Sequence, residues 1–298
     1  MFNKGVLFLV FITIYQLSFS QIQKDTTFTV YAEYKKNIKT YPFIQIVKPK
    51  HNSNIKVLEN IVYKNTGKRN LYLDAFLSKA PKKHPAIFLI HGGGWKSGNK
   101  EMNTPMALQL ASAGYNVFSL EYRLSDEDQY PSGMEDILEA IQFIIKNQHQ
   151  YQVNPNKIAV LGCSSGAQMA NLIGQKHPEY IKAIVNVDGI LAFHHPESKE
   201  GKMAAAWLGG SYEEVPQTWE DASPLNHVTI KSPPILFINS QFERFHAGRD
   251  DMIKKLNAFG IYSEIQKIEN SPHAFWVFDP WFNPTIQYTL QFLNKTLK

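Results

Sequence analysis

The order of apolar and polar residues changes character a little over a quarter of the way along the chain. In residues 27–78, β-branched and aromatic residues recur between turn signals, a pattern typical of strands. It predicts strands at Phe43–Lys48, Ile55–Tyr63 and Leu71–Leu77, with a hairpin turn at Asn65–Lys68. Beyond this region, short apolar runs alternate with segments of helical periodicity, which favours a mostly parallel sheet covered by helices on both faces.

The alternating region is regular enough to place its elements individually. Strands are expected at the apolar runs Ala86–Ile90, Val117–Leu120, Ile158–Leu161, Ile181–Val187, Ile235–Ile238 and Ile261–Ile268. The clearest helix is near Ser132–Gln148, where apolar residues recur every three or four positions and Ser132 and Glu135 have the spacing of a capping box. A similar stripe, from Ile286 to Leu297, predicts a final helix.

The organisation after residue 20 favours one domain. We find no internal repeat and no low-complexity linker, so residues 21–298 are expected to form a single α/β domain with extra N-terminal strands. The stretch Ile190–Val228 is the least regular part of this region and is a candidate for a small cap.

The first twenty residues have the features of a secretory signal peptide. Lys4 supplies the positive charge, and residues 5–19 are uncharged and mostly apolar. Ser18 and Ser20 are the small residues that a signal peptidase requires, which predicts cleavage between Ser20 and Gln21. The apolar run is shorter than the roughly 20 residues that span a membrane. We therefore expect export to a periplasm or beyond the cell, without a membrane anchor after cleavage.

Composition narrows the classes of function. With 44% hydrophobic and only 19% charged residues, the chain is expected to be globular. Its formal charge of +5 is mild and its basic residues are scattered, which argues against a nucleic-acid partner. The single cysteine, Cys163, excludes an internal disulfide and multi-cysteine metal centres.

Gly162-Cys163-Ser164-Ser165-Gly166 follows a predicted strand and opens a helix rich in small residues. This is the strand–turn–helix context in which G-x-S-x-G presents a nucleophilic serine at the tip of a sharp turn. A glycine-rich helix start that only packs on its strand is the alternative. The context favours Ser164 as a nucleophile, with Cys163 and Ser165 as less well placed competitors.

A second glycine motif, His91-Gly92-Gly93-Gly94-Trp95, follows the strand predicted at Ala86–Ile90. Successive glycines allow backbone N–H groups to turn toward a developing negative charge. We expect the N–H groups of Gly93, Gly94 and Ser165 to form an oxyanion hole. A phosphate-binding loop is the alternative, but neither G-K-[ST] nor G-x-G-x-x-G spacing is present.

The expected general base is His273, which lies between the last predicted strand and the last helix. Chain order Ser…acid…His then places the acid between Ser164 and His273. Glu243, just beyond the strand at Ile235–Ile238, is the first candidate for the acid. Asp250 and Asp188 remain as alternatives, in that order.

From about Asn60 to its end, the chain resembles the α/β-hydrolase superfamily, and within it the secreted esterases of the hormone-sensitive-lipase and feruloyl/acetyl carbohydrate-esterase type. The motifs above carry the resemblance, together with Glu121-Tyr122-Arg123-Leu124, Tyr130-Pro131 and Asp136, similar to a D-Y-R-L…F-P…D segment. Glu121 and Glu243 stand where that group more often has Asp. The loop Arg244–Arg249 also lacks the usual D-x-x-V-P pattern.

The resemblance implies an exported serine hydrolase that removes acetyl, methyl or feruloyl esters from a plant polysaccharide such as pectin or xylan, without a metal or organic cofactor. Candidate substrate contacts are Trp95, Trp276, Arg244 and Arg249, the arginines suiting an anionic glycan. Aromatic packing and a solvated basic loop are the competing explanations. A general carboxylesterase or lipase, a serine exopeptidase and a non-catalytic binding module are alternative functions.

Overall fold

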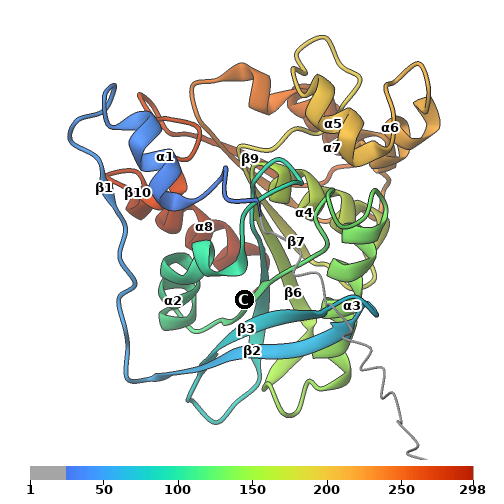
Figure 1. Cartoon of the computed structure of the whole chain (residues 1–298). Coiled ribbons are helices and arrows are strands. Elements are labelled where there is room, and N and C mark those ends of the chain that lie inside the picture. Colours follow the sequence, from blue (N-terminus) through green and yellow to red (C-terminus); the bar gives the residue numbers. More distant parts are fainter. Residues whose placement is uncertain (1–24, 298) are drawn as a thin grey trace, which may run out of the picture.

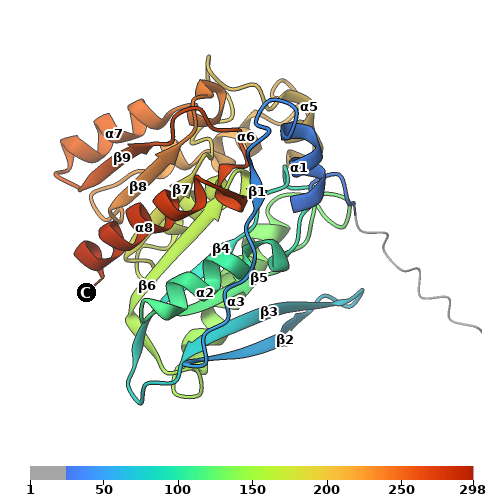
Figure 2. The same ribbon diagram turned by 90° about the vertical axis from the view of Figure 1, so that its left-hand side faces the viewer.

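The computed structural model describes residues 25–297, and its centre is an eight-stranded sheet (Figures 1 and 2). The strands lie in the order β2-β3-β5-β4-β6-β7-β8-β9. Their bounds are β2 Ile55–Asn65, β3 Asn70–Ser78, β4 His84–Ile90, β5 Asn116–Leu120, β6 Val153–Cys163, β7 Ala183–Val187, β8 Ile235–Asn239 and β9 Ser263–Lys267. β3 is antiparallel to both β2 and β5, and every other neighbouring pair is parallel. The expected α/β architecture with extra N-terminal strands is confirmed.

Helices cover both faces of the sheet. α2 (Thr104–Ser112) and α8 (Phe282–Thr296) pack on one face, while α3 (Ser132–Lys146), α4 (Ser165–Lys176) and α7 (Arg249–Ala258) pack on the other (Figure 2). Along β4, the side chains of Ile87 and Leu89 belong to the apolar core on the α2–α8 side of the sheet. Those of Phe88 and Ile90 belong to the apolar core on the side of α3, α4 and α7. Burial on both faces explains why these strands are continuous apolar runs in the sequence.

The two short helices α5 (Gly201–Leu208) and α6 (Pro216–Ala222) lie beyond the carboxyl ends of the parallel strands, at the top of Figure 1. They come from the irregular stretch 190–228. Parallel strands bring their carboxyl ends to one edge of a sheet, where α/β proteins place their ligands. The helices therefore stand over the edge where the motifs of the sequence converge.

The N-terminal segment differs from the strand-rich pattern of the sequence. Residues Val30–Asn37 form a helix, α1, capped by the Thr29 hydroxyl, which accepts a hydrogen bond from the N–H of Ala32 at 3.0 Å. The strand predicted at 43–48 shortens to β1 (Gln45–Ile46), which pairs antiparallel with β10 (Phe278–Asp279) outside the main sheet. An N-terminal cap and packing on the α2–α8 face outweigh the β-propensity of this segment.

The capping box expected at Ser132 and Glu135 is wrong. Helix α3 starts at Ser132 itself, its N-cap is Pro131, and no side chain caps it. Because Ser132 already has helical backbone angles, its hydroxyl is not in position to accept from the third helical N–H. The turn predicted at Asn65–Lys68 is present, with the N–H of Thr66 donating to the carbonyl of Arg69 at 3.0 Å.

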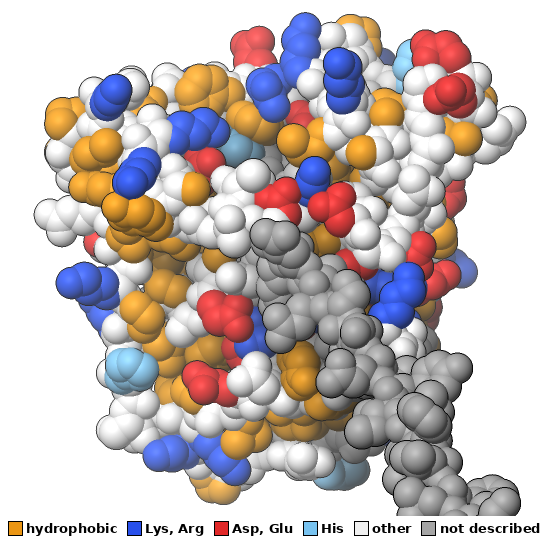
Figure 3. Space-filling model, in the orientation of Figure 1, with side chains coloured by type: hydrophobic (Ala, Val, Ile, Leu, Met, Phe, Trp, Pro, Cys, Tyr) orange, Lys and Arg blue, Asp and Glu red, His pale blue; other side chains and the backbone are white. Residues whose placement is uncertain are grey.

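The surface in Figure 3 mixes basic and acidic side chains, and neither sign forms a continuous area on that face. Within residues 25–297, no helix combines the length and apolar character needed to cross a membrane. The signal peptide predicted for residues 1–20 lies outside the described residues.

Candidate active site

Ser164 lies at the turn between β6 and α4, in a backbone conformation that few non-glycine residues adopt. Its φ is 55° and its ψ is −124°, and its N–H donates to the carbonyl of Val187 at 2.8 Å. Such strain persists only where the surrounding structure enforces it, and it is characteristic of functional turns. The sharp turn holds the Ser164 side chain at the carboxyl edge of the sheet.

The two glycines of the motif allow the strand and the helix to approach closely. A Cβ on Gly162 would lie 2.0 Å from the carbonyl oxygen of Gly166, and one on Gly166 would lie 2.2 Å from that of Ile90. Both contacts are with backbone atoms that cannot move aside. Glycine at these positions is therefore a requirement of the turn.

His273 follows β9 and lies next to Ser164, as expected. Its Nε2 is 2.8 Å from Ser164 Oγ. The ring of Phe245 stacks on the imidazole with centroids 3.4 Å apart, and Trp276 meets it edge-on at 5.3 Å. These two aromatic rings fix the orientation of the imidazole from two sides.

The acid beside His273 is Asp188, and the first choice, Glu243, is wrong. Asp188 Oδ2 lies 2.6 Å from His273 Nδ1, and the side chain is fully buried. Glu243 is exposed to solvent, and Asp250, the second choice, is paired with Arg249 at 2.8 Å. After β8 the chain turns into a short 3-10 helix, Glu243–His246, which carries Glu243 outward. Asp188 directly follows β7 and has a φ of 54°, which turns it toward His273.

Two further residues bind Asp188, and sequence reasoning did not find them. Ser240 donates to this carboxylate from its N–H at 2.9 Å and from its hydroxyl at 2.7 Å, and His246 Nε2 lies 3.1 Å from Oδ1. Both flank the loop in which the acid was expected. For Asp188 itself, the sequence offers only its place directly after a buried strand, which made it the last of the three candidates.

Hydrogen bonds from His246, His273 and Ser240, with the charge of His273, outweigh burial and lower the pKa of Asp188 to about 2. Because a carboxylate accepts hydrogen bonds and does not donate, Nδ1 of His273 carries a proton and donates to Asp188. Nε2 is then left as the acceptor for the Ser164 hydroxyl.

The lowered pKa of Asp188 makes a pH-dependent contribution to stability. A carboxyl whose folded pKa lies below its unfolded value stabilises the fold above that unfolded value, and the contribution is lost as the pH falls through the folded pKa. We expect the unfolding free energy of the wild type to exceed that of Asp188→Asn by about 2 kcal/mol more at pH 6 than near pH 2. Urea denaturation of both proteins over this range measures the difference, and parallel pH profiles would contradict it.

The glycine loop after β4 brings Gly94 to the recess at Ser164, whereas Gly93 is not among the residues that border this recess. Gly93 and Gly94 have φ values of 130° and 62°, and Gly94 and Ser165 border the same recess as Ser164. In the backbone hydrogen bonds of residues 25–297, neither the Gly93 nor the Gly94 N–H donates to another loop or turn. Ser165 is the first residue of α4, where N–H groups have no intrahelical partner.

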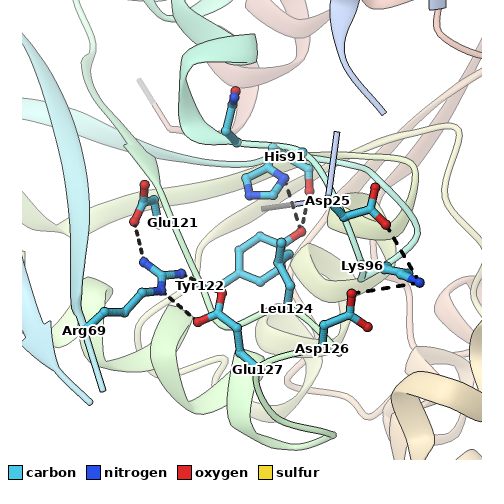
Figure 4. Close-up of a pocket in the computed structure, with 11 residues that line it drawn as sticks. Asp25, Arg69, His91, Lys96, Glu121, Tyr122, Leu124, Asp126 and Glu127 are labelled. Carbon is cyan, nitrogen blue, oxygen red and sulfur yellow. Dashed lines mark hydrogen bonds and ion pairs between the residues drawn. The ribbon is translucent and has the colours of Figure 1, made fainter. Parts of the chain in front are cut away.

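A polar network behind this loop holds it in place (Figure 4). His91 Nδ1 lies 2.9 Å from the carbonyl of Gly92, and its ring stacks on Tyr122, whose hydroxyl donates to the carbonyl of His91 at 2.8 Å. Beside them, Arg69 lies between Glu121 and Glu127, with nitrogen–oxygen distances of 2.8 Å and 2.7 Å. His91 therefore braces the loop, and the longer side chain of Glu121 forms an ion pair with Arg69.

Arg123 and Asp136, which belong to the same motif as Glu121 and Tyr122, make structural contacts. Arg123 makes two bonds to the buried carboxylate of Asp136, from Nε at 2.8 Å and from Nη2 at 2.9 Å. Lys64 of β2 reaches the same carboxylate at 2.8 Å. The motif thus ties β2, the segment after β5 and helix α3 together.

The recess at Ser164 is small, with a volume of about 20 Å³. Around Ser164 it is bordered by Gly94, Trp95, Ser165, Ile190, Glu200 and Phe245. Trp95 stacks on Trp207 with centroids 5.1 Å apart, and its Nε1 donates to Gln168 at 2.9 Å. A rigid aromatic wall therefore closes the recess on this side.

Of the other predicted substrate contacts, none is among the residues that line the recess, and only Arg244 contacts a residue that does. Trp276 is buried against His273, and Arg249 donates to Asn239 and to Asp250 at 2.9 Å and 2.8 Å. Arg244 pairs with Glu200 at 3.5 Å and stacks over Phe245, and both of these residues border the recess. The basic charge of this loop is thus largely balanced within the protein.

Two other chemistries receive no support at this edge of the sheet. Burial and the nearby charge of Asp188 raise the pKa of Cys163, so its thiol is not activated as a nucleophile. In the part of the chain that the structure describes, no group of three or more His, Cys, Asp and Glu residues could hold a metal ion.

The fold and this serine–histidine–aspartate geometry define an α/β-hydrolase, and the solved structures agree on the fold. A truncated form of a carbohydrate esterase from gut microbiota superposes with a TM-score of 0.69 and 20% identity, over 82% of this chain and 99% of that chain. More narrowly, the chain belongs to the BD-FAE family, whose model matches residues 73–246.

Two curated relatives from Mycobacterium tuberculosis (strain ATCC 25618 / H37Rv) match 64% of this chain. One, a probable carboxylic ester hydrolase called LipM, is 23% identical over 209 residues, which cover 47% of its length. The other, the esterase LipC, is 25% identical over 209 residues, which cover 50% of its length. The chain therefore matches about half the length of each of these relatives.

Proposed function

We propose that this chain is a serine carboxyl-ester hydrolase. The observation that carries the proposal is the continuous line from Ser164 Oγ through both nitrogens of His273 to Asp188, with distances of 2.8 Å and 2.6 Å. An alcohol, an imidazole and a buried carboxylate in this arrangement are what acyl transfer requires. The esterase names of LipM and LipC support the same reaction class.

The geometry supports a two-step mechanism. His273 Nε2 takes the proton of Ser164 as its oxygen attacks the ester carbonyl, and the imidazolium is stabilised by Asp188. The oxyanion forms against the N–H groups of Gly93, Gly94 and Ser165, at the positive end of the α4 dipole. The alcohol leaves with the proton from His273, and water then hydrolyses the acyl-enzyme by the same groups. Every step uses only side chains, backbone and water.

For the substrate, we propose a polysaccharide that carries ester groups. Acetyl esters are favoured over methyl or feruloyl esters. A recess of about 20 Å³ holds one or two water-sized groups, which suits the methyl of an acetyl group and not a feruloyl ring. The carbohydrate-esterase neighbour supports a glycan as the alcohol part. Because Arg244 and Arg249 have partners within the chain, a neutral glycan such as xylan is favoured over pectin.

The site of action that we propose is outside the cytoplasm. The support is the pattern of residues 1–20, with its single positive charge, apolar run and small residues before Gln21. A polysaccharide substrate is consistent with export, because such polymers do not enter cells intact.

A substrate panel tests the acyl preference. We expect kcat/KM for p-nitrophenyl esters to fall at least about tenfold from acetate to octanoate, since the longer chain cannot enter the recess without displacing Trp95 or Ile190. Acetate release from acetylated xylan, measured in the same assay, should exceed methanol release from methyl-esterified pectin. Preference for octanoate would favour a lipase, and absence of turnover on every ester would contradict an esterase.

A further inference from the structure

One carboxylate near Ser164 has no role in the mechanism above. Glu200 precedes α5 and borders the recess, with a side chain that is 11% exposed. Its Oε1 is buried and accepts no hydrogen bond from any residue in the range 25–297. The nearest cation, Arg244 Nη2, lies at 3.5 Å without the geometry of a hydrogen bond. An unsatisfied buried carboxylate oxygen is costly to a fold and is usually explained by a function.

The surroundings of Glu200 keep it available as an acceptor. Burial raises the pKa of this carboxyl, while the positive charges of Arg244 and His273 favour its ionised form. An ionised carboxylate accepts hydrogen bonds and donates none, so its complement in a substrate is a hydroxyl or an ammonium group. Since Arg244 already supplies a positive charge, a neutral hydroxyl is the better match.

From these contacts we infer that Glu200 is a specificity-determining residue that accepts a hydrogen bond from a hydroxyl on the alcohol part of the ester. This inference rests on the proposed function and extends it: the substrate is an ester of a polyol such as a sugar, with a free hydroxyl near the scissile bond. A carboxylate on the substrate at this position would be repelled by Glu200, so esters of neutral sugars are preferred over uronates.

A matched pair of substrates isolates this contact. The first is a monoacetylated methyl xyloside, and the second is the same compound with its remaining hydroxyls methylated. Both carry the same acyl group, so they make the same demands on Ser164, His273 and the oxyanion hole. The ratio of their kcat/KM values therefore reports the hydroxyl contact, and we expect at least about a tenfold preference for the free xyloside, equivalent to about 1.4 kcal/mol.

Three variants test the residue. Glu200→Leu removes both oxygens at similar volume and should lower the ratio about tenfold, toward unity. Glu200→Gln keeps one acceptor oxygen and should restore part of the preference. Glu197→Gln, in the same segment but with a side chain 53% exposed, is the control and should leave the ratio unchanged. Thermal denaturation of each variant verifies that it is folded.

The outcomes separate the inference from the proposed function. If Glu200→Leu slows both xylosides equally, the residue has a general structural or electrostatic role and the inference is wrong. An unchanged ratio would overturn it as well. If the wild type hydrolyses p-nitrophenyl acetate but neither xyloside, the sugar substrate itself is wrong, and the inference fails with it.

Discussion

Replacing Ser164 with alanine should lower kcat on p-nitrophenyl acetate and on acetylated xylan by on the order of 10⁵-fold or more. The reason is that its Oγ is the only alcohol within the described residues that His273 Nε2 contacts, at 2.8 Å. Removal of that oxygen leaves the oxyanion hole and the imidazole without a nucleophile. Initial rates with both substrates measure the loss, and mass spectrometry of the wild type after rapid mixing should show an acyl adduct that the variant lacks.

The control for this experiment is the neighbouring Cys163. Its thiol is buried and has a raised pKa, so Cys163→Ala should keep kcat within about threefold of the wild type. The Ser164→Ala variant should still bind acetylated xylan, because the recess is otherwise intact. Affinity electrophoresis measures this binding. A variant that retains more than a thousandth of the wild-type rate would contradict the role of Ser164.

The second large effect is expected at Asp188. Asp188→Asn should reduce kcat by on the order of 10³- to 10⁴-fold, because an amide cannot stabilise the imidazolium and its N–H₂ group can hold His273 in the wrong tautomer. The acceptor that His273 Nδ1 now meets at 2.6 Å would be lost. The measurement is kcat across pH 5 to 9, which separates a lower plateau from a shifted profile.

Glu243→Gln is the matched control, because this carboxylate is the one that the sequence favours. Its side chain is exposed, and we expect activity within about twofold of the wild type. Asp250→Asn should behave in the same way, since its partner is Arg249. A larger loss in Glu243→Gln than in Asp188→Asn would mean that the acid changes place when substrate binds.

The local geometry around Ser164 can be anticipated from the sequence where consecutive residues encode it. Positions 162 and 166 must be glycine because backbone contacts there exclude any Cβ. The turn around Ser164 can therefore be recognised from a motif of five consecutive residues. The position of His273 follows from chain order and from one predicted strand. In both cases the local sequence carries most of the physical constraint.

The acid could not be predicted in this way, because its contact joins residues 85 positions apart. Whether Glu243 or Asp188 reaches His273 depends on where the chain turns after β7 and after β8. The deciding features are the φ of 54° at Asp188 and the short helix that begins at Glu243. Neither has a strong signature in the sequence. Helix α1 was missed for a related reason, since tertiary packing overrides the β-propensity of its segment.

Because Asp188 directly follows β7, the acid beside His273 and the residues that border the recess after β8 come from different loops. Ser240 and His246 stay fixed because both bind the acid, whereas the segment between them carries Phe245, which borders the recess, and Arg244, which pairs with Glu200 beside it. Exchange of the residues at 242–244 can therefore alter which alcohol is accepted without moving the acid. This arrangement makes the loop a site where substrate preference can diverge among related enzymes, and where directed evolution can begin.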